Sequence, residues 1–173
     1  MPHSISAISN TAVRIFLQKF GKDYDIKRGF KPLTDRLNTY EKKELLNYFN
    51  YECCFCGKKF DNNKNFSRDH LIPQNKESLG LHAWGNVVYC CKSCNDEKNK
   101  QPWEDFLKSK SENKNEFENR KAKLKAFISD KKYEIDVDFL RKFAKSLYID
   151  VGEVAMALID LRYKQAGGAE SKK

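Results

Sequence analysis

The chain has 173 residues, 40% of them hydrophobic and 33% charged, a balance that suits one folded domain with helical additions and excludes a disordered chain. The 33 Lys and Arg residues outnumber the 24 Asp and Glu residues, and the net charge of +9 attracts polyanions such as nucleic acid. Apolar runs are too short for a membrane span, and the first ten residues lack the features of a secretory signal, so we expect no membrane contact and a cytoplasmic location.

Residues 1–50 are predicted to form an N-terminal helical segment. Apolar residues that recur at the spacing of one helix face are Val13, Phe16, Leu17 and Phe20. Gly21 is placed to end that helix, and a loop is expected from Gly21 to Leu37. A second helix is expected after Asn38, because its side chain can cap the helix while Glu41 completes a capping box.

The character of the chain changes at residues 51–101, where cysteines, aromatics and glycines interrupt any helical period. Short strands are expected at 66–72 and 86–90. All the cysteines of the chain lie in two tight groups within this segment: Cys53, Cys54 and Cys56, then Cys90, Cys91 and Cys94. Such clustering indicates a metal site, since disulfide frameworks usually spread their cysteines along a small secreted domain.

Residues 102–166 are predicted to form a C-terminal helical segment. Pro102 suits the first turn of a helix, and the Lys- and Glu-rich run from 108 to 132 is expected to be a solvated helix face. A further helix is expected on the apolar face formed by Leu140, Phe143, Ala144 and Leu147. Asp150 is then expected to open a separate helix with Glu153 as its capping-box partner. These helices are expected to pack with the N-terminal ones as a scaffold, and residues 167–173 are expected to be a disordered tail.

Two CxxC pairs, separated by 34 residues, predict a structural zinc site. The expected ligands are Cys53, Cys56, Cys91 and Cys94. Two residues between cysteines let both sulfurs of a turn face one ion, and four thiolates leave no coordination position open for chemistry. Cys54 and Cys90 adjoin these ligands, so spacing alone leaves another choice of sulfurs, or an iron–sulfur cluster, open. The matched pairs favour zinc.

Asp69 and His70 lie between the two cysteine pairs, and Asn95 directly follows Cys94. Phosphodiester hydrolysis needs a base that activates water, together with a divalent cation on hard oxygen ligands. A neutral imidazole suits the first role, and a carboxylate and an amide oxygen suit the second. Adjacent residues of a strand point to opposite faces, so periodicity alone does not place Asp69 and His70 in one cleft.

The string CxxCG…DHLIP…NVVYCxxCNxxK, over residues 53–98, resembles the HNH endonuclease family in its zinc-ribbon form with a ββα-metal core. The resemblance implies that His70 is the general base and that Asp69 and Asn95 bind the catalytic Mg²⁺ or Mn²⁺. It also implies that Asn86 braces the loop and orients the base. The third letter of the motif is here Asn rather than His, a substitution that favours hard cations.

The same resemblance implies that Lys98 approaches the phosphate backbone, with Arg68 and Lys100 as further candidates for phosphate contact. Trp84 and Trp103 are expected in the core, and no role is assigned to His82.

The sequence therefore predicts an α+β fold, with a ββα-metal HNH core and a four-cysteine zinc ribbon flanked by N- and C-terminal helices. The expected function is metal-dependent hydrolysis of DNA, with double-stranded DNA as substrate. Three alternatives stay open: a zinc-ribbon module that binds nucleic acid or protein without cutting, an RNA-directed nuclease, and a homodimer or larger complex in place of a monomer.

Overall fold

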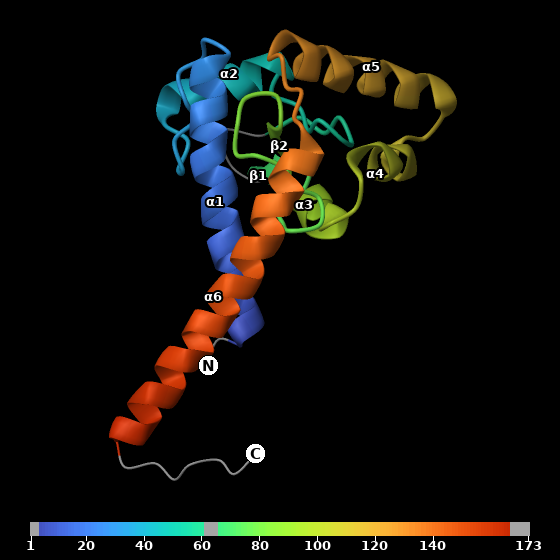
Figure 1. Ribbon diagram of the computed structural model, residues 1–173. Helices are drawn as coiled ribbons and strands as arrows, with labels where there is room; N and C mark the ends of the chain where they lie inside the picture. The colour runs from blue at the N-terminus through green and yellow to red at the C-terminus, as the bar shows by residue number, and fades with distance from the viewer. Residues whose placement is uncertain (1–3, 61–65, 167–173) are drawn as a thin grey trace.

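The computed structural model describes residues 4–60 and 66–166, and within them the protein has six helices and one two-stranded sheet (Figure 1). In chain order the elements are α1 (Ile5–Lys27), α2 (Thr39–Tyr48), β1 (Phe66–His70), β2 (Val87–Cys91), α3 (Lys92–Lys98), α4 (Trp103–Lys110), α5 (Lys114–Asp130) and α6 (Val137–Gln165). The predicted α+β class is confirmed. The predicted tail at 167–173 lies outside the described residues. None of the described helices combines the length and the apolar character that a membrane span requires.

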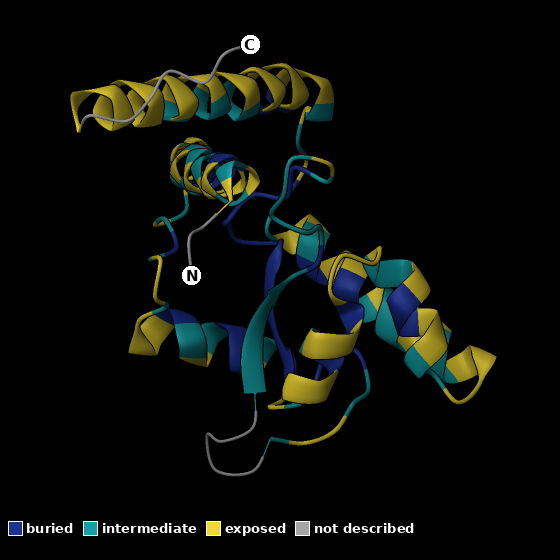
Figure 2. Ribbon diagram, turned by 90° about the horizontal axis from the view of Figure 1, so that it is seen from below, coloured by how far each residue is buried: buried dark blue, intermediate teal, exposed yellow. Residues whose placement is uncertain are grey.

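The centre of the molecule is a ββα unit. β1 and β2 pair antiparallel, with Phe66 opposite Cys91 and His70 opposite Val87, and α3 follows β2 directly. All residues of β2 are buried, whereas those of β1 are half-buried, so β1 is the strand nearer to solvent (Figure 2). β1 ends at His70, two residues earlier than predicted, because the chain leaves the sheet at Ile72, whose amide bonds to the Asn86 side chain instead of to a strand carbonyl.

Two apolar clusters hold the flanking helices against this unit. The first joins α2, α4 and α5 to β2 and includes Leu45, Phe55, Val88, Phe106 and Phe127. The second joins α1 and α6 to the segment between the strands and includes Val13, Leu17, Leu81, Tyr133 and Leu140. α1 and α6 lie side by side in antiparallel directions (Figure 1). As predicted, Trp84 is buried in the core, and Trp103 packs against the first cluster.

The prediction that Gly21 ends the first helix is wrong, because α1 continues to Lys27. The glycine is instead the point where α1 meets the segment between the strands: a Cβ at this position would lie 2.5 Å from the carbonyl oxygen of His82. The first part of the predicted loop at 21–37 is therefore helical. The capping box of Asn38 and Glu41 is present as predicted, and Pro102 is the N-cap of α4 rather than its first helical residue.

The predicted break at Asp150 is also wrong, since α6 is one helix of 29 residues. The Asp150 carboxylate accepts a hydrogen bond from the Ser146 hydroxyl, one turn earlier, and so serves no new helix start. α5 carries many solvated charges, as predicted, but also buries Leu124 and Phe127 in the first cluster. The end of α6 extends beyond the rest of the molecule and is exposed along most of its length (Figures 1 and 2).

Candidate active site and metal centre

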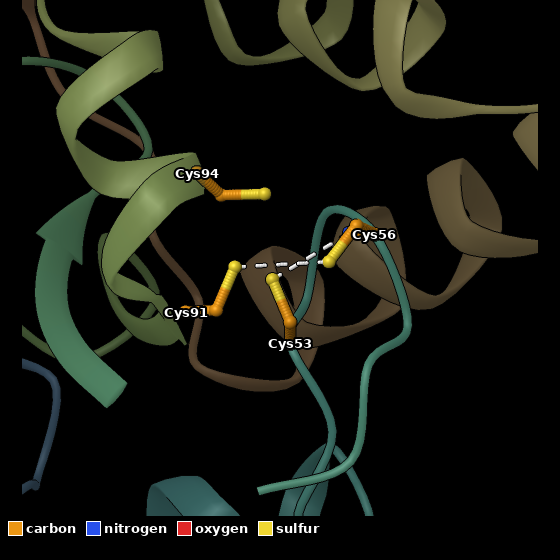
Figure 3. A group of neighbouring side chains, drawn as sticks. All are labelled: Cys53, Cys56, Cys91 and Cys94. Carbon is orange, nitrogen blue, oxygen red and sulfur yellow. Dashed lines mark hydrogen bonds between the residues drawn. The ribbon is translucent and has the colours of Figure 1, made fainter. Parts of the chain in front are cut away.

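The four predicted zinc ligands gather at one point. Figure 3 shows Cys53 and Cys56 on the turn before β1, Cys91 at the end of β2 and Cys94 on α3, with their sulfurs directed toward one another. The four Sγ atoms all lie within 4.8 Å of one another. Gly57 closes the first turn with a positive φ of 70°, which a residue with a Cβ adopts only with strain.

The donor set and its dimensions fit a tetrahedral zinc ion. With Zn–S bonds of about 2.3 Å, two ligand sulfurs should stand about 3.8 Å apart, and the Cys56 and Cys91 sulfurs are 3.8 Å apart. A hydrogen bond from the Cys94 thiol is the main cause that lowers the pKa of Cys53, so one sulfur is already disposed to be a thiolate. The cluster joins the first turn to the β2–α3 junction, which is the connection a structural metal provides.

Cys54 and Cys90 lie outside this group. Burial raises the pKa of both thiols, which favours the neutral form that does not bind metal. The Cys90 thiol points to the Ser67 carbonyl oxygen at 3.8 Å, on the other side of the strand. The alternative choice of sulfurs left open by spacing is therefore disfavoured by position.

A cleft of about 720 Å³ opens beside the end of β1. Asp69 and His70 both line it, so the geometry overcomes the alternation of side chains expected along a strand. His70 is the last residue of β1, where the chain leaves the sheet. Burial lowers the pKa of His70 well below its usual value, with smaller contributions from His82 and from the charge of Arg68. Its imidazole is therefore neutral and able to accept a proton at neutral pH.

Asp69 is paired with a lysine that sequence analysis expected at the surface. The Lys98 side chain is 0% exposed, and its ammonium lies 3.1 Å from Asp69 Oδ2 and donates to the His70 carbonyl oxygen at 2.8 Å. Burial raises the pKa of the Asp69 carboxyl, and the Lys98 charge lowers it in part. The Lys98 ammonium thus points inward to Asp69 and the His70 carbonyl rather than to the surface, and its predicted contact with the phosphate backbone stays a prediction.

Asp69 meets the requirement for a cation ligand in part. Its carboxylate belongs to a residue that lines the cleft, but its Oδ2 atom is buried in the ion pair with the Lys98 ammonium at 3.1 Å. Mg²⁺ is commonly bound through one or two protein oxygens with water in the remaining positions. Asn95 is half-buried on α3 and is not among the residues that line the cleft, whereas Asn99, one turn further, lines it.

Asn86 is fully buried and bridges the two ends of the segment between the strands. Its Oδ1 accepts the Ile72 amide at 2.7 Å, and its Nδ2 donates to the carbonyl oxygens of Ile72 at 3.0 Å and Leu81 at 2.8 Å. Ile72 follows His70 by only two residues, so this amide holds the chain directly after the imidazole. The Asn86 side chain therefore fixes the backbone that carries His70.

His82 is a residue to which sequence analysis assigned no role. It is fully buried, and its Nδ1 lies 3.2 Å from His70 Nε2 while its Nε2 lies 3.0 Å from the Thr34 carbonyl oxygen. No local sequence pattern predicts this contact, because Thr34, His70 and His82 come from three separate segments. The sequence offered only an isolated histidine in an apolar stretch as a sign that His82 has a role.

The remaining wall of the cleft is polar and basic. Arg68 and Lys100 line it, as their predicted roles require, although Arg68 also donates to the Asp35 carbonyl oxygen. The opposite wall comes from α1, whose lining residues recur at a spacing of four: Asn10, Arg14 and Gln18. No motif in the sequence indicated that the first helix faces the predicted site.

Comparison with known proteins supports this interpretation of the central segment. Residues 53–111 match a family model described as HNH endonuclease. No curated protein matches the chain. The match begins at the first zinc-site cysteine and covers β1, β2, α3 and α4. Residues 53–111 are thus similar to the HNH endonuclease family, which confirms the resemblance inferred from the sequence and supports a nuclease-type function in general.

Proposed function

We propose that the protein is a metal-dependent endonuclease that hydrolyses phosphodiester bonds in DNA, with His70 as the general base. The observation that carries this proposal is the cleft in which a neutral imidazole, a buried carboxylate and several basic side chains meet. The family match supplies the reaction class. Asp69 and Asn95 are the proposed protein ligands of a Mg²⁺ or Mn²⁺ ion, and Asn99 is the alternative amide because it already lines the cleft.

The protein's own residues divide the work of hydrolysis. His70 accepts a proton from the attacking water, since its buried imidazole is neutral. Lys98 holds the Asp69 carboxylate and the His70 carbonyl together, so it positions the base and the cation ligand relative to one another. When bound, a divalent cation neutralises charge on the phosphate oxygens and the departing oxygen.

The basic side chains that line the cleft are proposed to bind the phosphate oxygens of the substrate. They are Arg14 on α1 and, across from it, Arg68, Lys76 and Lys100. Contacts to the phosphate backbone do not recognise a particular base sequence. Double-stranded DNA is the proposed substrate. The cysteine cluster is proposed to hold a structural Zn²⁺ ion that stabilises the fold and takes no part in hydrolysis.

The first test is cleavage of supercoiled plasmid with Mg²⁺, with Mn²⁺ and with EDTA. His70→Ala should abolish metal-dependent nicking at unchanged zinc content, whereas Lys145→Ala, which removes an exposed lysine from α6, should leave it unchanged. DNA binding without cutting by the wild type would favour the non-catalytic zinc-ribbon module. Cleavage of RNA but not of DNA by the same His70-dependent activity would replace DNA as the substrate.

A further inference from the structure

The contacts of His82 determine which nitrogen of His70 is free. A carbonyl oxygen only accepts hydrogen bonds, so His82 Nε2, 3.0 Å from the Thr34 carbonyl oxygen, must carry the proton. In a neutral imidazole the other nitrogen is then an acceptor, which makes His82 Nδ1 the acceptor at 3.2 Å from His70 Nε2. His70 Nε2 therefore donates, and the Nδ1 atom of His70 keeps its lone pair.

We propose that the Thr34 carbonyl and His82 together fix the tautomer and orientation of His70, so that its Nδ1 atom is the one that takes the proton from water. The role rests on the proposed function of His70 as base. His82 touches no reacting atom and is a positioning residue. His82 must be uncharged for its Nδ1 atom to accept, and burial of its ring favours the uncharged imidazole.

The hydrogen bonds from Thr34 through His82 to His70 form a relay, and the N-terminal segment, which lies outside the family match, holds both of its ends. Thr34 is fixed through Glu41, which is 2% exposed and accepts the Thr34 amide at 3.2 Å and its hydroxyl at 2.6 Å. Glu41 is in turn part of the capping box of α2. On the other side, Gly21 of α1 packs against the His82 backbone with no room for a Cβ. The segment from Gly21 to Glu41 thus places the acceptor that orients the proposed base.

Ring-nitrogen NMR tests the proposal without any activity measurement. The chain has only three histidines, so two-bond ¹H–¹⁵N spectra of the zinc-loaded protein can assign the tautomer of each ring. The wild type should show His70 protonated at Nε2 and unprotonated at Nδ1, and His82 likewise. In His82→Leu the His70 ring should become a mixture of tautomers. A wild-type His70 protonated at Nδ1 would overturn the proposal.

Kinetics supplies the second measurement. His82→Leu should lower kcat for plasmid nicking by about 100-fold, within the range of general-base catalysis, with KM nearly unchanged. His82→Asn keeps an acceptor near the Nδ1 position and should recover part of kcat. A variant that unfolds or loses zinc is recognised by circular dichroism and metal content. Correct NMR tautomers with no cleavage by any variant would refute the proposed function and leave the relay intact, whereas unchanged kcat in folded His82→Leu would refute its role.

Discussion

The bridge made by Asn86 offers the sharpest test of how the site is built. Asn86→Ala removes three hydrogen bonds of a fully buried amide, those to the Ile72 amide, the Ile72 carbonyl and the Leu81 carbonyl. Each such bond contributes about 1 kcal/mol net, and the Ile72 amide left without a partner costs a further 1 to 3 kcal/mol or so. The expected loss in the free energy of unfolding is therefore about 4 to 6 kcal/mol.

Thermal unfolding at matched zinc content measures this loss. For a chain of this size each kcal/mol lowers Tm by about 2 to 4 °C, so Asn86→Ala should lower Tm by roughly 10 °C or more. Asn115→Ala, which changes an exposed asparagine on α5, is the matched control and should shift Tm by no more than about 2 °C. Below the Tm of the variant, nicking should also fall, because the backbone after His70 has lost its brace.

A small effect would refute the reasoning. If Asn86→Ala lowered Tm as little as the control, Asn86 would be an ordinary turn residue, and the bridge across the segment between the strands would carry no stability. A large loss of stability with unchanged nicking per folded molecule would instead separate the fold from the orientation of His70.

The zinc cluster, the buried ion pair, the α1 wall and a second buried carboxylate can each be tested separately. Zinc removal by a selective chelator, or Cys91→Ser, should release one zinc per chain and abolish cooperative unfolding, whereas Cys54→Ala should retain the metal, as metal analysis would show. Lys98→Met should lower the free energy of unfolding by about 3 to 5 kcal/mol by leaving the Asp69 carboxylate buried and unpaired, and adding Asp69→Asn should recover most of the loss in a double-mutant cycle. Arg14→Ala should raise KM for DNA and reduce the salt dependence of binding by about one phosphate contact, with hydrolysis of a small phosphodiester unchanged; equal effects of Lys19→Ala, on another face of α1, would contradict the assigned wall. Burial raises the pKa of Asp25 to about 6, so carboxyl ¹³C NMR should give a midpoint near 6; because this pKa lies above the unfolded value of 3.8, the group's contribution to stability should weaken as pH rises from 4 to 6, and a midpoint below 4.5 would contradict it.

The metal cluster and the class of the domain could be predicted from local sequence patterns alone. Ligand spacing in a CxxC turn is set by local backbone geometry, so two such turns predict four converging sulfurs without knowledge of the fold. The same holds for the capping box of Asn38 and Glu41, which acts within one turn of helix. Asp69-His70 and its distance from the two cysteine pairs sufficed for the family resemblance.

The surroundings of His70, in contrast, could not be predicted without the packed fold. The burial of Lys98 depends on how α3 lies on β1, and the contact of His82 with His70 depends on the segment between the strands folding back beneath α1. Helix periodicity showed that α1 has an apolar face, but the partner of its polar face is a matter of three-dimensional packing. Contacts between residues distant in sequence arise from packing that no local pattern encodes, and for this protein those contacts orient the base and form the second wall of its cleft.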